Sequence, residues 1–132
     1  MFGVPPLSRW FIRTALMYLL VSLVVGAGGP WFGTSFVVWP TYVHLLVLGW
    51  LTQMIFGVAF WMFPRQRGAS SGWKEVAGWG AYLSLNLGLV LRAIVESRPS
   101  DTDGKWFVIA ALLQLAAGWT LIGLIWPRVK AR

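Results

Sequence analysis

The chain has no cysteine, a single histidine and few charged residues of either sign. Among its 132 residues, four are acidic and eleven are lysine or arginine. Without cysteine the chain cannot form disulfides, thiolate metal sites, iron–sulfur clusters, a thiol nucleophile or a CxxCH haem attachment. Charged residues make up 11% of the chain and hydrophobic residues 58%, whereas soluble domains have about 25% charged residues. The composition therefore indicates an integral membrane protein.

Catalytic and nucleic-acid motifs are also missing. The glycine-rich stretch GAGGPW lacks the lysine of a phosphate-binding loop, and no serine has a base-and-orienter set around it. The ten tryptophans fit interfacial belts in a membrane protein. We expect no catalytic residue in this chain and no nucleic-acid partner.

Four long apolar runs account for most of the sequence. Each is close to the length of about 20 residues that a helix needs to cross the hydrocarbon core. Clusters of turn-forming residues separate them, such as GAGGP and SRPSDTDGK. We expect one domain over residues 1–132, an all-α integral membrane protein built as a four-transmembrane-helix bundle. The predicted spans are residues 10–28, 42–63, 76–96 and 106–126.

Prolines mark the expected ends of these spans. Pro64 is predicted to stop the second span and Pro127 the fourth, because proline lacks the N–H that continues a helix. Residues 29–41, bounded by Pro30 and Pro40, are expected to form an uncharged aromatic loop at the membrane interface or a cap over the helices.

The basic residues predict the orientation in the membrane. With four spans, both termini and the 64–75 loop lie on one side, and an excess of lysine and arginine marks the cytoplasmic side. We therefore expect both termini inside (N-in/C-in) and the acidic residues Glu96, Asp101 and Asp103 outside. The first side holds Arg9, Arg13, Arg65, Arg67, Lys74, Arg128, Lys130 and Arg132, and the second holds Arg92, Arg98 and Lys105.

Three spans repeat a small–polar–small pattern at positions i, i+4 and i+8. Small residues let helices approach closely in lipid, and the polar group between them can hydrogen-bond across the contact. At about 100° per residue, His44 is predicted to lie on the face opposite the Gly49 stripe, above bulky apolar residues that suit a flat macrocycle, lipid or a second subunit. The stripes are Gly49–Gln53–Gly57, Gly80–Ser84–Gly88 and Ala110–Gln114–Gly118.

A run of residues in and just after the second span has a familiar pattern. It consists of His44-Leu-Leu-Val-Leu-Gly49-Trp50, Ile55-Phe56-Gly57-Val58-Ala59-Phe60-Trp61 and Pro64-Arg65. This run resembles subunit I of the haem–copper oxidases, with the cbb3-type oxidases and nitric oxide reductases as the closer relatives in that superfamily. The resemblance covers roughly residues 40–65, and the third span only loosely. In that family a histidine near the outer end of a helix binds low-spin haem b.

The resemblance implies a small, cytochrome b-like protein of the bacterial inner membrane. His44 would be an axial ligand of the iron of haem b, and Arg92, at a similar depth, would pair with the haem propionates. The expected role is electron transfer, haem handling or gas sensing. A haem–copper active site needs several histidines and this chain has one, so oxygen or nitric oxide reduction by the chain alone is excluded and no enzyme is expected.

The second axial ligand is left open among three sources. A homodimer would supply His44 of the second copy, because a two-fold interface places identical residues opposite each other. Met54 or Met17 of the same chain is another source, and a five-coordinate iron is the third. The expected partners are the lipid bilayer and a homodimer or larger respiratory complex.

Each site residue also has a plainer interpretation. Arg92 would form an i,i+4 ion pair with Glu96 or extend to the interface, and His44 would be a hydrogen-bonded residue in a haem-free membrane subunit or assembly partner of a respiratory oxidase. A channel lined by Gln53, Gln114 and Asn86 is the weakest alternative, since the sequence shows no internal repeat or broken helix. Copper or zinc at His44 would lack ligands beyond the outer carboxylates.

Overall fold

The computed structural model describes residues 5–33, 35–63, 72–98 and 103–130, and the regular secondary structure in these ranges is helical throughout. Four of its helical segments are long and apolar enough to cross a membrane. The predicted all-α fold with four membrane-spanning helices is confirmed, while its N-in/C-in orientation stays a prediction. The elements are α1 (Pro6–Trp31), α2 (Ser35–His44), the π-helix η1 (Leu45–Thr52), α3 (Gln53–Met62), α4 (Gly72–Glu96) and α5 (Gly104–Lys130).

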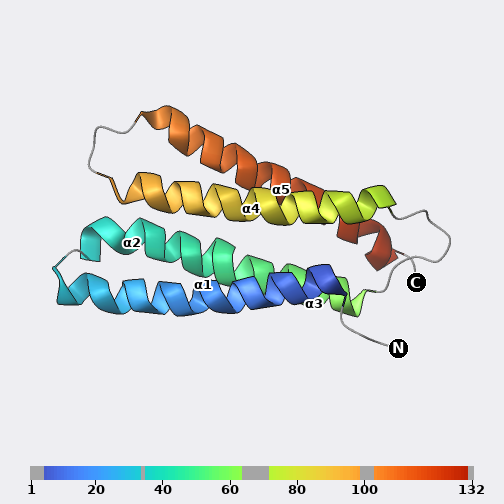
Figure 1. Cartoon of the computed structure of the whole chain (residues 1–132), viewed down its shortest axis with the longest axis horizontal. Coiled ribbons are helices and arrows are strands. Elements are labelled where there is room, and N and C mark those ends of the chain that lie inside the picture. The colour runs from blue at the N-terminus through green and yellow to red at the C-terminus, as the bar shows by residue number, and fades with distance from the viewer. Residues whose placement is uncertain (1–4, 34, 64–71, 99–102, 131–132) are drawn as a thin grey trace.

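The helices form two hairpins that lie against each other (Figure 1). In the first hairpin, α1 packs along the continuous rod made by α2, η1 and α3; in the second, α4 packs along α5. The hairpins meet where α4 contacts α2 and η1 and where α3 contacts α5. Both termini lie at the same end of the molecule, as an even number of spans requires (Figure 1).

The buried core lies where the two hairpins meet. Phe11 of α1 stacks on Phe60 of α3 with ring centroids 6.0 Å apart and meets Tyr82 of α4 edge-on at 5.2 Å. Ser8 donates a hydrogen bond to the carbonyl of Gly57, which ties α1 to α3. The buried residues of this core are Phe11, Phe60, Ala81, Leu85, Leu89, Ala117 and Leu121.

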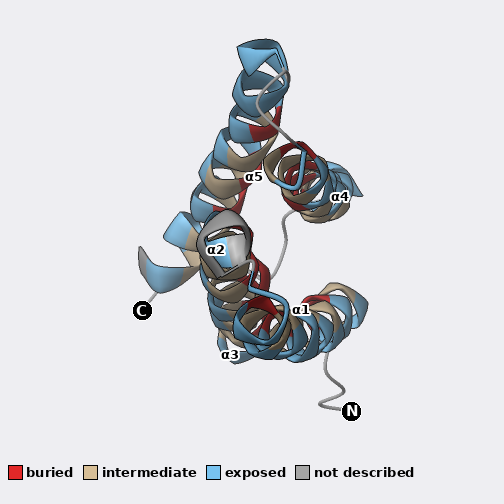
Figure 2. Cartoon of the chain, turned by 90° about the vertical axis from the view of Figure 1, so that its left-hand side faces the viewer, coloured by how far each residue is buried: buried red, intermediate tan, exposed pale blue. Residues whose placement is uncertain are grey.

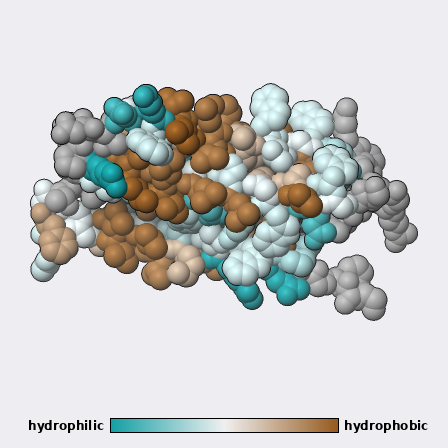
Figure 3. All heavy atoms as spheres, turned by 45° about the horizontal axis from the view of Figure 1, so that its top comes forward, coloured by the Kyte–Doolittle hydropathy of each residue, from teal (hydrophilic) through white to brown (hydrophobic). Residues whose placement is uncertain are grey.

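Most apolar side chains outside this core are exposed (Figure 2). In the most apolar window of each span, between 17% and 33% of the residues are buried. Hydrophobic side chains cover much of the face shown in Figure 3, between hydrophilic residues nearer its two ends. So much exposed apolar surface does not suit a soluble monomer, and hydrocarbon would cover it in a bilayer.

The predicted small-residue stripes form helix contacts at some positions and not at others. A Cβ added at Gly49 would come within 2.6 Å of the Tyr18 ring on α1, and one at Gly88 within 3.0 Å of the Ala110 carbonyl on α5. Gly80 and Gly118 have no such neighbour within 4 Å. All three stripes therefore contribute to close helix contacts, whereas Gly80 and Gly118 do not.

The prediction of a loop over residues 29–41 is wrong. Helix α1 continues through Pro30 to Trp31, and α2 already begins at Ser35. The Tyr42 ring packs against Gly26, where a Cβ would lie 2.8 Å from it. This packing of α2 on α1 outweighs the low helix propensity of the GAGG segment, because tertiary contacts routinely override propensity.

The helix ends predicted from proline agree with the structure for the second span and not for the fourth. Helix α3 ends at Met62, as expected for the second span, although Pro64 lies outside the described residues. Pro127, in contrast, lies inside α5, which continues to Lys130. The missing N–H of Pro127 costs the helix one hydrogen bond, to the carbonyl of Gly123 four residues earlier, and only one helical turn follows it.

Candidate functional site

The π-helix η1 decides which way His44 faces. In an α-helix His44 and Gln53 would lie about 180° apart, because they are nine residues apart at about 100° each. A π-helix closes i→i+5 hydrogen bonds and takes about one more residue per turn, so two turns shift the faces by about two residues. The hydroxyl of Thr52 reinforces the wide turn by donating to the carbonyl of Val47, five residues back, at 2.9 Å. His44 and Gln53 both contact α4.

The prediction that His44 lies opposite the whole Gly49 stripe is therefore wrong for one residue of that stripe, Gln53. His44 lies on the side of the rod that faces α4, together with Gln53 of that stripe. Three of the apolar residues expected below the imidazole lie on an exposed face instead: Val47 is 44% exposed, Leu51 44% and Ile55 56%.

Glu96 joins the two predicted site residues at the end of α4. Its side chain is 7% exposed. Nδ1 of His44 lies 2.9 Å from Oε1, within ion-pair distance but outside hydrogen-bond geometry. Nε of Arg92 donates to the same oxygen at 3.1 Å, and the hydroxyl of Thr41 donates to Oε2 at 3.1 Å. The residues Thr41, His44, Arg92 and Glu96, with Gln114, are called the Glu96 cluster below.

Arg92 extends the Glu96 cluster to α5. Its Nη1 donates to Oε1 of Gln114 at 3.3 Å, while the Nε2 atom of Gln114 is buried without a partner. The i,i+4 pair between Arg92 and Glu96, weighed in the sequence against propionate binding, is present. The cluster thus links α2, α4 and α5 through one carboxylate and one guanidinium.

A second polar contact joins α3 to α4 at another level. Nε2 of Gln53 donates to Oδ1 of Asn86 at 3.0 Å, and Nδ2 of Asn86 donates to the Tyr82 carbonyl at 2.7 Å. The hydroxyls of Tyr82 and Thr14 lie 2.5 Å apart, which adds α1 to this network. The glutamines and the asparagine considered as channel-lining residues are thus divided between two polar clusters.

The ligands available for a metal ion near His44 are few. Among the described residues there is no group of three or more histidine, cysteine, aspartate or glutamate side chains that could hold one. Asp101, a candidate in the sequence, lies outside the described residues, and Asp103 is exposed. Met17 is 60% exposed on α1. A haem iron bound at His44 remains the metal chemistry to consider, since it needs one imidazole and not a cage.

Two residues of the cluster, Thr41 and Glu96, were not predicted as site residues, although Glu96 was weighed as the ion-pair partner of Arg92. Thr41 carried no signal of its own. Glu96 did, because it is the only acidic residue within the four predicted spans, and an ionisable residue inside a span suggests a functional site and a partner.

Comparison with known proteins gives no relative: no family model, curated protein or solved structure matches the chain. The resemblance to haem–copper oxidase subunit I therefore rests on the residues around His44 alone.

Proposed function

We propose that the chain is a haem b-binding protein of the bacterial inner membrane, oriented N-in/C-in, with His44 as an axial ligand. The contact between His44 and Glu96 carries this proposal. Metal-binding histidines usually turn the second ring nitrogen toward a carboxylate, which fixes the orientation of the ring. Nδ1 faces Glu96, no described residue bonds Nε2, and the side chain is 29% exposed. Nε2 therefore suits a ligand from outside the chain.

Three residues of the Glu96 cluster would each have a different role in binding the haem. His44 would bind the iron through Nε2, and Glu96 would hold the imidazole in place through Nδ1. Arg92 would supply the positive charge that favours propionates. Haem, when bound, would supply a reversible one-electron centre or a gas-binding iron.

A homodimer would complete the site. One copy offers one imidazole, and its side chain is 29% exposed, so a second copy can approach the ring. A two-fold interface near the partly exposed ring would bring the second His44 to the opposite side of the haem.

Absorption spectra of the purified protein test the proposal. Oxidised and dithionite-reduced spectra of the wild type should show the bands of haem b, and His44→Ala should lose them. Thr120→Ala is the control, because the Thr120 hydroxyl bonds the Ala116 carbonyl of its own helix, α5, so its spectrum should be unchanged. A low-spin spectrum confined to the dimer fraction would support the second His44 as ligand.

Two results would contradict this assignment. Wild-type protein made with ample haem and showing no Soret band would contradict haem binding, and a band that survives His44→Ala would contradict the ligand. Carbon monoxide separates the roles, since it shifts the reduced spectrum only where a coordination position is open. Such a shift favours gas sensing or haem handling over electron transfer.

One observation favours a second candidate, a haem-free membrane subunit or assembly partner. Arg92 and Glu96 neutralise each other, and Glu96 also contacts His44 and Thr41. These groups can hold the helices together without a ligand. A colourless protein that Glu96→Gln destabilises would support this candidate over the first.

A further inference from the structure

Thr52 has the only side-chain hydroxyl in η1, whose sequence is LLVLGWLT. This hydroxyl donates to the carbonyl of Val47, five residues back, at 2.9 Å. In an α-helix a threonine hydroxyl bonds the carbonyl three or four residues back. The hydrogen bond that Thr52 makes therefore fits the i→i+5 turn of a π-helix, and it would have to change partner if η1 became an α-helix.

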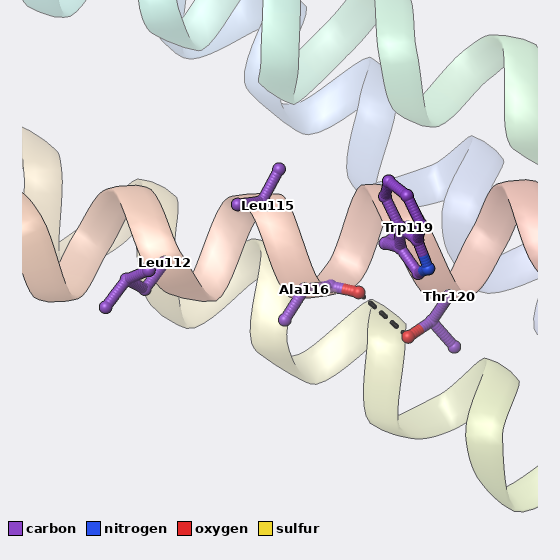
Figure 4. Close-up of a pocket in the computed structure, with 5 residues that line it drawn as sticks. All are labelled: Leu112, Leu115, Ala116, Trp119 and Thr120. Carbon is purple, nitrogen blue, oxygen red and sulfur yellow. Dashed lines mark hydrogen bonds between the residues drawn. The ribbon is translucent and has the colours of Figure 1, made fainter.

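Thr120 of α5 shows the ordinary α-helical arrangement for comparison. Its hydroxyl donates to the carbonyl of Ala116, four residues back, at 2.8 Å (Figure 4). Each threonine thus bonds a carbonyl of its own spanning segment, and the two bonds differ in the length of the turn that they close. Only the bond of Thr52 distinguishes the π-helical from the α-helical register.

The register of η1 decides which residue of the rod meets Glu96. Gln53, just after η1, is bonded to Asn86 of α4. Counting back from Gln53, two turns of π-helix take about nine residues and end at His44, whose Nδ1 lies 2.9 Å from Oε1 of Glu96. Two turns of α-helix take about seven residues and would end at Leu46. A change of register would therefore exchange the imidazole for a leucine at the Glu96 cluster.

We infer that Thr52 is a positioning residue for His44. Its hydroxyl favours the π-helical register, and that register turns the imidazole toward Glu96. Thr52 acts through the backbone of η1, as a π-helix next to a functional site can do. The consequence for haem binding rests on the function proposed above, whereas the effect on the register does not.

Paired cysteines measure the register, because the native chain has no cysteine. A short bifunctional thiol reagent should join His44→Cys to Glu96→Cys in preference to joining Leu46→Cys to Glu96→Cys. Thr52→Val keeps the shape of the side chain without its hydroxyl and should lower this preference about two- to tenfold, the effect of one hydrogen bond. Thr52→Ser keeps a hydroxyl and should keep the preference.

Thr120→Val is the matched control, since it removes the same kind of bond from an α-helix and should leave the preference unchanged. A preference unchanged in Thr52→Val, or lowered equally in Thr120→Val, would overturn the inference. A gain of the crosslink at residue 46 separates a change of register from general loosening, which would weaken both crosslinks. Should Thr52→Val not fold, Thr52→Ala removes the same hydroxyl and gives the same comparison.

Haem binding provides a second readout with a separate meaning. With His44 and Glu96 in place, Thr52→Val should lower the affinity for haem b by a similar factor in a titration followed at the Soret band. A wild type that binds no haem would contradict the proposed function and leave the crosslinking result standing. Normal crosslinking preference in Thr52→Val, with haem bound by the wild type, would contradict the role of Thr52 alone.

Discussion

At the scale of single residues, Glu96 explains why His44 and Arg92 are placed together. The Glu96 side chain is 7% exposed, and its carboxylate needs partners because an uncompensated charge away from water is costly. Arg92 supplies the charge, Thr41 a hydrogen bond, and His44 a ring nitrogen within ion-pair distance. Whether or not haem is bound, the cluster depends on this carboxylate.

Replacing Glu96 with glutamine should therefore destabilise the protein. Glu96→Gln keeps the size of the side chain but leaves Arg92 without its counter-charge, and we expect a loss of about 1–3 kcal/mol in the free energy of unfolding. Unfolding in mixed detergent micelles measures it. Arg98→Gln is the control, since Arg98 is exposed beyond the end of α4 and its change should stay within about 0.5 kcal/mol. Equal stability of the two variants would show that the cluster contributes nothing to folding.

Gly49 and Gly118 make a matched pair for testing the helix contacts. A Cβ at Gly49 would lie 2.6 Å from Cγ and 2.9 Å from Cβ of Tyr18, the stiff base of that side chain, whereas one at Gly118 meets nothing within 4 Å. Gly49→Ala should cost about 1–3 kcal/mol, as overpacking does. Gly118→Ala should be neutral or stabilising, because alanine is the better helix former. The same unfolding measurement compares them, and a harmless Gly49→Ala would refute the close contact with α1.

At the scale of elements, η1 is what the sequence could not reveal. LLVLGWLT is an apolar helical run with no proline and one glycine, and nothing in it distinguishes i→i+5 from i→i+4 bonding. The spans themselves were predictable, because length and apolarity suffice for that. The direction in which His44 points was not predictable, because the π-helix η1 shifts the helix faces by about two residues.

Crosslinking can test the register of η1, and a chain without native cysteine gives no background. His44→Cys with Glu96→Cys, and Gln53→Cys with Asn86→Cys, should both react with a short bifunctional thiol reagent, because both original pairs are in contact. Val47→Cys with Glu96→Cys is the control and should react poorly, since Val47 is on the exposed face. In a regular α-helix the first two pairs could not both face α4. Crosslinking of residues 53 and 86 without crosslinking of 44 and 96 would count against the π-helix.

At the scale of the whole molecule, some of the site followed from topology and some required the fold. The sequence placed His44 and Arg92 at one level because each lies near the same end of its span, and the structure brings both to one oxygen of Glu96. The sequence could not show that Glu96 contacts His44 as well as Arg92, because contact between α2 and α4 depends on how the two hairpins pack. Gln53 and Gln114 looked equivalent as stripe residues, yet they bond to Asn86 and to Arg92, respectively.

The orientation of the molecule is a prediction from charge that labelling can decide. Gly72 begins α4 and Gly104 begins α5, so they lie at opposite ends of the bundle (Figure 1). Both are exposed, and a Cβ at either meets nothing within 4 Å, so cysteine should be tolerated at both. If the basic end is cytoplasmic, a membrane-impermeant maleimide should label Gly104→Cys in intact cells and Gly72→Cys only after lysis. The reverse pattern would place the Glu96 cluster at the cytoplasmic surface.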